Sequence, residues 1–202
     1  GLVKFDILGL ATLEVISQAC RLVSIREGIT YDEALKKIDP KVMDFNSMEI
    51  LKNVFWDGNM TGIFSVTSAG MMKLFQRVKP TCFDDVAAVT ALFRPGPLGS
   101  GMDSMFADRK NGIEKVSYDH PILEDIMKDT YGCLVYQEQM LEIGRRLGKM
   151  SWKDTNRLRK LFLKKDKSKQ DDYIKKEEDE LKAKLIAGCM ENGLSENKGE
   201  EL

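Results

Sequence analysis

Apolar and polar residues follow two different periods along this chain. At its start, Val3, Phe5 and Ile7 lie on one side of the backbone and Lys4 and Asp6 on the other, which is the period of a β-strand. Later segments place apolar residues three or four positions apart, as amphipathic α-helices do. The pattern predicts a mainly α fold with one N-terminal strand and one or two short strands elsewhere.

Helix start and stop signals divide the rest of the chain. A Ser or Thr followed three residues later by Asp or Glu predicts helix starts at Thr30, Thr81 and Ser151, and Pro121 is expected in the first turn of another helix. Residues 60–66 are expected to be extended. The predicted helices span about 12–23, 30–38, 47–54, 69–78, 81–92, 102–110, 137–147, 151–163 and 171–187.

Composition places the chain among soluble globular proteins. Of 202 residues, 43% are hydrophobic and 31% are charged, so the chain can bury a core. Its four cysteines are scattered and it has one histidine, which argues against a zinc site and suits a reducing compartment. No apolar run approaches the length of a membrane span. We therefore expect a cytoplasmic protein that does not enter a membrane.

Charge is distributed unevenly, although the net charge is only −1. Residues 145–169 contain eleven Lys or Arg and two Asp, and a helix there would concentrate positive potential on one surface, as phosphate binding requires. The alternative is a solvated surface offset by the acidic residues 171–180. The basic face comprises Lys153, Arg157, Lys160 and Lys164, and the buried face is expected to comprise Trp152, Leu158, Leu161 and Phe162.

Three other features are chemically ambiguous. Asp6 either pairs with Lys4 as a structural ion pair or ligates a hard cation such as Mg²⁺. The segment Phe93–Ser100 is expected to be a shaped loop because it holds two prolines and two glycines, and Arg94 in it either contacts phosphate or carboxylate or caps the preceding helix. Gln137 is the first residue of a predicted helix. Its side-chain amide either contacts DNA, or the residue has only a structural role at the helix start.

Five collinear stretches resemble one family, the C-family replicative DNA polymerases, typified by the alpha subunit of bacterial DNA polymerase III. They extend over most of the chain and occur in the family's order. The stretches are GLVKFDILGL (1–10), TGIFSVTSAGM (61–71), CFDDVAAVTALFRPGPLGSGM (82–102), TYGCLVYQEQML (130–141) and NRLRKLFLKK (156–165).

The resemblance implies a role for the N-terminal strand. In the family this is the last palm strand, and its Asp is the third catalytic carboxylate, so Asp6 is expected to help hold two Mg²⁺ ions during nucleotidyl transfer. The other two carboxylates are expected upstream of Gly1. Lys4, on the same face, is expected near the triphosphate. One carboxylate does not make a two-metal site, so the isolated fragment is expected to be inactive.

The remainder resembles the helical fingers of these polymerases. The resemblance implies that Arg94 lies near the nucleotide or template, and that Arg159 and Lys160 contact the incoming triphosphate together with Lys164 and Lys165. The sequence departs from the family pattern because Lys160 replaces an Arg and cannot make a forked contact. Leu163 also replaces a Gly. The residues expected to contact DNA are Arg145, Arg146, Lys153, Arg157 and Gln137.

The resemblance implies that residues 1–10 belong to the palm and residues 11–194 to fingers that are incomplete at their C-terminal end. The polar composition of residues 195–202 predicts a frayed tail. The resemblance also implies a DNA-directed DNA polymerase that acts in replication, with primer-template DNA, dNTP and the rest of the polymerase chain as partners. A sliding clamp and other replisome subunits are expected to bind through other regions. The alternative is a non-catalytic helical module that binds nucleic acid through residues 145–169.

Overall fold

The fold is mainly helical, as predicted. The computed structural model describes residues 4, 5, 7, 9–162 and 172–201, and within these ranges all regular secondary structure is helical. Lys4, Phe5 and Ile7 belong to no strand, and the other positions of the predicted strand, including Asp6, lie outside the described residues. No helix in the described ranges is both long enough and apolar enough to cross a membrane.

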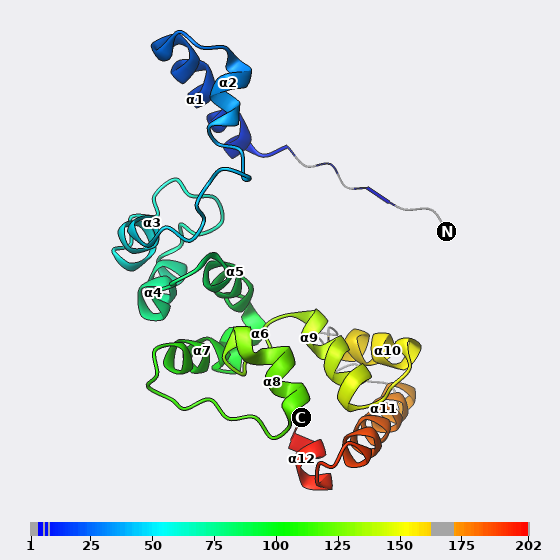
Figure 1. Ribbon diagram of the computed structural model, residues 1–202. Helices are drawn as coiled ribbons and strands as arrows, with labels where there is room; N and C mark the ends of the chain where they lie inside the picture. The colour runs from blue at the N-terminus through cyan, green and yellow to red at the C-terminus, as the bar shows by residue number, and fades with distance from the viewer. Residues whose placement is uncertain (1–3, 6, 8, 163–171, 202) are drawn as a thin grey trace.

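The first two helices form a hairpin at one end of the molecule (Figure 1). Helix α1 (Ala11–Glu27) ends at Gly28, whose φ of 66° suits a left-handed cap. Helix α2 (Tyr31–Lys36) begins with the predicted capping box: the Thr30 amide donates to Glu33 at 2.8 Å and the Glu33 amide donates to Thr30 Oγ1 at 3.2 Å. Large apolar side chains of this hairpin are exposed, among them Leu13, Val15, Leu22 and Ile25.

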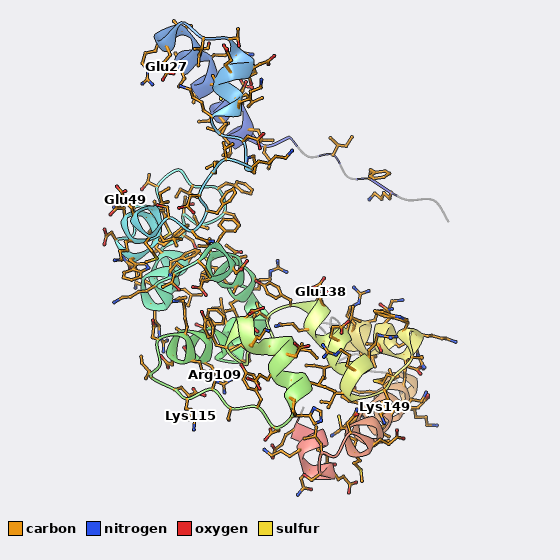
Figure 2. The ribbon with its side chains drawn as sticks, in the orientation of Figure 1. Glu27, Glu49, Arg109, Lys115, Glu138 and Lys149 are labelled. Atoms are coloured by element: carbon orange, nitrogen blue, oxygen red, sulfur yellow. The ribbon has the colours of Figure 1, made fainter. Side chains whose placement is uncertain are left out.

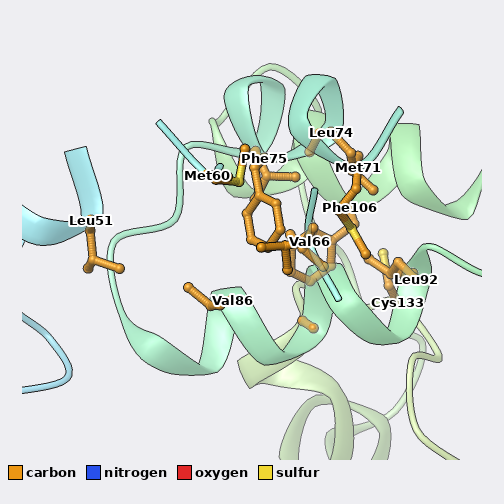
Figure 3. Packing of buried hydrophobic residues seen from close by; sticks show 14 residues of the cluster. Leu51, Met60, Val66, Met71, Leu74, Phe75, Val86, Leu92, Phe106 and Cys133 are labelled. Carbon is orange, nitrogen blue, oxygen red and sulfur yellow. The ribbon is translucent and has the colours of Figure 1, made fainter. Parts of the chain in front are cut away.

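The central helices surround the largest apolar core (Figures 1 and 3). Phe75, Phe106, Val89 and Leu92 are completely buried there, and Phe55 packs on Phe75 with ring centroids 4.6 Å apart. This core fixes the relative positions of helices that are far apart in sequence. They are the π-helix η1 (Leu51–Trp56), α4 (Ala69–Val78), α5 (Phe83–Leu92) and α7 (Met102–Lys110). The short helix α3 (Met48–Ile50) directly precedes η1, and α6 (Pro95–Gly99) lies between α5 and α7 in the chain.

Two loop predictions in this part were wrong. Residues 60–66 form two successive turns instead of an extended segment, with Gly62 and Ser65 at φ values of 83° and 66°. The segment predicted as a shaped loop contains the short helix α6. Its prolines fall in the first turn of that helix, where no backbone N–H is needed for an intrahelical bond, so they do not break it.

The C-terminal helices build a second, smaller assembly. Its cores include Leu147 and Cys189 in one cluster and Leu158 and Leu181 in another. Residues 196–201, expected to be frayed, instead form a helix whose Gly199 is buried against α11. The elements are α8 (Pro121–Met127), the 3₁₀-helix η2 (Lys128–Thr130), α9 (Gln137–Glu142), the π-helix η3 (Ile143–Leu147), α10 (Trp152–Phe162), α11 (Asp172–Glu191) and α12 (Glu196–Glu201).

A buried polar network centres on Asp85, in the first turn of α5. Its side chain is 2% exposed and lies 3.4 Å from Lys110 Nζ, whose side chain is 5% exposed. It also accepts hydrogen bonds from the Thr81 amide at 2.8 Å and from the Tyr131 hydroxyl at 3.0 Å. Burial and the neighbouring Asp85 carboxylate raise the pKa of Tyr131, which keeps its phenol a donor. Cys82, and not Thr81 as predicted, is the residue that precedes α5.

Candidate nucleic-acid interface

Helix α10 carries four of the predicted cationic residues, Lys153, Arg157, Arg159 and Lys160. Ser151 caps it by accepting from the Asp154 amide at 3.1 Å, as the sequence predicted. Leu158 is buried with Met150 and Leu181, so this side of the helix packs on α11. That packing determines which of the basic side chains are left for the outer surface.

Arg157, predicted to contact DNA, is held by carboxylates. Its Nε lies 2.8 Å from Glu177 and its Nη1 lies 3.0 Å from Asp154. The hydrogen bond to Glu177 raises the pKa of Arg157 further above its usual value. In this position the acidic helix offsets the basic stripe, which was the alternative that the sequence left open. Lys153 and Lys160 of the same stripe are exposed.

Asp154 holds several of these groups together. Its carboxylate accepts from the Ser151 hydroxyl at 3.0 Å and lies 3.5 Å from Lys184 Nζ. The hydrogen bond from Ser151, followed by the one from Arg157, lowers the pKa of the Asp154 carboxyl. The negative charge of Asp154 on α10 is therefore neutralised by contacts within the fold.

Arg159 lies two residues after Arg157 on α10 and has a different environment. It is partly buried, and its Nη1 donates to Gln137 Oε1 of α9 at 3.3 Å. Its Nε is buried and has no hydrogen-bond partner among the described residues. A buried N–H without a partner costs about 1–3 kcal/mol, so this unsatisfied donor marks Arg159 as a candidate site residue. The structure thus brings together two predicted site residues, Arg159 and Gln137.

The position of Gln137 is fixed by its neighbour Gln139. The Gln139 side chain is buried and accepts from the Val135 and Tyr136 amides at 2.8 and 2.9 Å. Its amide nitrogen donates to Thr130 Oγ1 at 2.7 Å. Gln139 therefore ties the first turn of α9 to η2, and this contact, which the sequence did not indicate, supports Gln137 beside Arg159.

The two arginines of η3, Arg145 and Arg146, differ in the groups that they contact. Arg146 lies 2.8 Å from Asp125 and 4.0 Å from Glu142, so it is ion-paired. Arg145 instead places its guanidinium carbon 4.0 Å from the centre of the Trp152 ring. Trp152 was predicted to be buried and that prediction was wrong: it is 55% exposed, because it occupies the first position of α10, before the helix reaches the α11 contact.

The remaining predicted residues lie in other parts of the chain or outside the described residues. Arg94 is exposed and precedes α6, and Lys4 is exposed near the N-terminus. Asp6, Lys164 and Lys165 lie outside the described residues. Among the residues that the structure does describe, no three His, Cys, Asp or Glu side chains are grouped so that they hold a metal ion. These residues therefore do not fit a complete magnesium site.

Other basic side chains are paired with carboxylates, as Arg157 is. Arg109 donates to Glu114 at 2.8 Å and to the Gly132 carbonyl at 3.1 Å, and Lys149 lies 3.1 Å from Glu191 (Figure 2).

Comparison with known proteins identifies related sequences. The family model described as "Bacterial DNA polymerase III alpha subunit finger domain" matches residues 12–192. The DNA polymerase III subunit alpha of Campylobacter jejuni is 38% identical over 201 residues, which is 100% of this chain and 15% of the relative. The proteins of the same name from Aquifex aeolicus and Escherichia coli are 37% and 38% identical over 98% and 82% of the chain, and the chain covers 16% and 14% of their lengths.

Proposed function

The chain belongs to the family of bacterial DNA polymerase III alpha subunit finger domains, and from this we propose that it binds incoming nucleotide and primer-template DNA within a replicative DNA polymerase. The chain spans about one-sixth of the length of the curated relatives it matches. The polymerase activity proposed here therefore belongs to a longer polypeptide, and the chain by itself is expected not to extend primers.

The environment of Arg159 is the observation that carries this proposal. Its Nε is buried and has no hydrogen-bond partner within the described part of the chain, while Gln137 accepts from its Nη1 at 3.3 Å. A guanidinium held on one edge and unsatisfied at another N–H suits a phosphate oxygen, which accepts charge-assisted hydrogen bonds. We assign the triphosphate of a dNTP to Arg159, with the exposed Lys160 beside it on the same helix.

The proposed reaction is attack of a primer 3′-hydroxyl on the dNTP. Two Mg²⁺ ions, when bound, would lower the pKa of that hydroxyl and neutralise the transferring phosphate. Asp6 and carboxylates elsewhere in the polypeptide would hold them, and this assignment rests on the family resemblance. Contacts with a sliding clamp and other replisome subunits are proposed through other regions of the polypeptide.

The alternative is a non-catalytic module that binds nucleic acid along the whole basic stripe. Ion pairs of Arg157 with Glu177 and of Arg146 with Asp125 weigh against it, because these cations are already neutralised. A stripe with such gaps offers fewer charges for releasing counterions from DNA. The alternative predicts DNA binding that dNTP does not strengthen.

Arg159→Ala tests the proposal in the full-length polymerase that carries this chain. We expect kcat/KM for dNTP to fall about ten- to a hundredfold, since a hydrogen bond to a charged group contributes roughly 1.5–3 kcal/mol. The measurement is steady-state incorporation of a single nucleotide on a primer-template.

Arg157→Ala is the matched control, because Arg157 lies two residues away on the same helix but is paired with Glu177. It should leave kcat/KM for dNTP within about twofold while lowering stability modestly. Equal losses for the two variants, or none for Arg159→Ala, would contradict the assignment of the triphosphate to Arg159.

A further inference from the structure

An exposed indole stacked on an arginine stands at the start of α10. The guanidinium carbon of Arg145 lies 4.0 Å from the centre of the Trp152 ring, and Trp152 is 55% exposed. Arg145 comes from η3 and Trp152 from α10, so the packing of these two helices brings the pair together. With Arg145 on one face of the ring, the exposed area leaves other parts of the indole open to a ligand.

The charge of Arg145 is available, in contrast to that of its neighbour Arg146. No ion pair joins Arg145 to a carboxylate of the described residues, whereas Arg146 is paired with Asp125 at 2.8 Å. A cation over an aromatic ring is stabilised by roughly 0.5–1 kcal/mol at an exposed site, which orients the guanidinium without neutralising it. Arg145 therefore keeps donors and a positive charge for an anionic group.

The surroundings of the pair are positive. Lys153 follows Trp152 directly and is exposed. The nearest acidic residue in sequence, Asp154, is occupied by the Ser151 hydroxyl at 3.0 Å and by Arg157 at 3.0 Å. An aromatic ring set among unneutralised cations is the combination that binds single-stranded nucleic acid, because bases stack on the ring while phosphates meet the cations.

Trp56, the other tryptophan of the chain, has a different environment from Trp152. Trp56 also lies near cations, with Lys52 and Lys79 Nζ 5.4 and 5.8 Å from its ring centre. However, its Nε1 donates to the Pro80 carbonyl at 2.9 Å, and the side chain is partly buried beside the central core. Trp56 is thus built into the fold, whereas Trp152 is presented outward.

We propose that Arg145 and Trp152 form a stacking site for an unpaired base of single-stranded DNA. The base stacks on the exposed indole, and the adjoining phosphates contact Arg145 and Lys153. An unpaired base offers free faces for stacking, whereas base pairs inside a duplex are stacked on both sides. This inference rests on the proposed function, which places DNA near α9 and α10, and it adds Trp152 as a residue that contacts the strand.

The test compares Trp152→Ala, Trp152→Phe and the parent in the full-length polymerase that carries this chain. Binding of a fluorescently labelled oligo-dT strand is followed by anisotropy, next to an abasic strand of the same length and charge. We expect Trp152→Ala to weaken oligo-dT binding on the order of tenfold and Trp152→Phe to restore most of it. Binding of the abasic strand should be the same for all three proteins.

Phe64→Ala is the matched control, since Phe64 is a similarly exposed aromatic residue, at 58%, in another part of the molecule. It should leave the binding of both strands unchanged. The proposal is overturned if Trp152→Ala binds oligo-dT like the parent, or if it loses the same factor with the abasic strand.

The outcomes separate this inference from the proposed function. Failure of the stacking site leaves the effect of Arg159→Ala on dNTP incorporation in place, because Trp152 is not assigned to the triphosphate. Failure of the proposed function instead removes the Arg159 effect, whatever Trp152 does. Circular dichroism of each variant confirms that any loss of binding occurs in a folded protein.

Discussion

The central assembly around α4–α7 and the C-terminal assembly around α9–α11 differ at particular charged side chains, although Arg157 and Arg146 of the second are also ion-paired. In the first, Asp85 and Lys110 are almost completely buried and paired at 3.4 Å. In the second, Arg145 stacks on an exposed ring, and Arg159 keeps a buried Nε without a partner among the described residues. Charge that is fully satisfied stabilises a fold, whereas charge left unsatisfied is available to a ligand.

The largest effect on stability is expected in the central assembly. Asp85→Ala leaves Lys110 buried without its carboxylate and should lower the free energy of unfolding by about 3–5 kcal/mol, the usual cost of breaking a buried pair. The measurement is urea unfolding followed by circular dichroism. Asp84→Ala is the control, because Asp84 is exposed one residue earlier and should cost less than about 1 kcal/mol.

A smaller and more local effect is expected from Gly188→Ala in α11. A Cβ there would lie 1.9 Å from the Gly148 carbonyl oxygen, so the backbone of α11 must move away from the end of η3. Such overpacking costs about 1–3 kcal/mol. Hydrogen exchange should show faster opening of α9–α11 with α4–α7 unchanged.

Gly99→Ala is the control for that experiment, because a Cβ at Gly99 meets nothing within 4 Å. It should leave hydrogen exchange in α9–α11 as it is in the parent. If Gly188→Ala instead opens both assemblies equally, the two form one cooperative unit and the contrast between them does not extend to stability.

The smallest effect depends on pH and involves Asp154. Ser151 and then Arg157 lower the pKa of this carboxyl in the folded state, so its contribution is complete above the pKa of the unfolded chain, about 3.9, and is lost as pH falls below it. Asp154→Asn should therefore be less stable than the parent near pH 7 by less than about 1 kcal/mol. The difference in Tm should shrink as pH falls from about 3.9 through the lower pKa of the folded carboxyl; a constant difference would exclude this carboxylate as its cause.

Local sequence signals predicted the helices better than they predicted the site. The helix 69–78 and the helix 102–110 were predicted with the bounds that the structure has, because capping residues and apolar spacing act over a few positions. The helical turn in Phe93–Ser100 was missed, since prolines were taken as breakers although they stand in a first turn.

The candidate site was harder to predict, because it is formed by contacts between residues that are far apart in the sequence. Periodicity placed Arg157 and Lys153 on one basic face, but it did not reveal that Glu177 of α11 neutralises Arg157. Nor did it reveal the bond between Gln137 and Arg159, which are 22 residues apart. Trp152 was assigned to the buried face by its spacing, yet the apolar contact with α11 is made further along the helix, at Leu158.

The hairpin of α1 and α2 has a practical consequence for biochemistry. Leu13, Val15, Leu22 and Ile25 are exposed on α1, and outside a larger polypeptide such a surface favours self-association. Purification of the 202-residue chain is therefore best planned at low concentration. Changing two of these four residues to Lys or Glu should improve its solubility without touching the helices on which Arg159 and Trp152 lie.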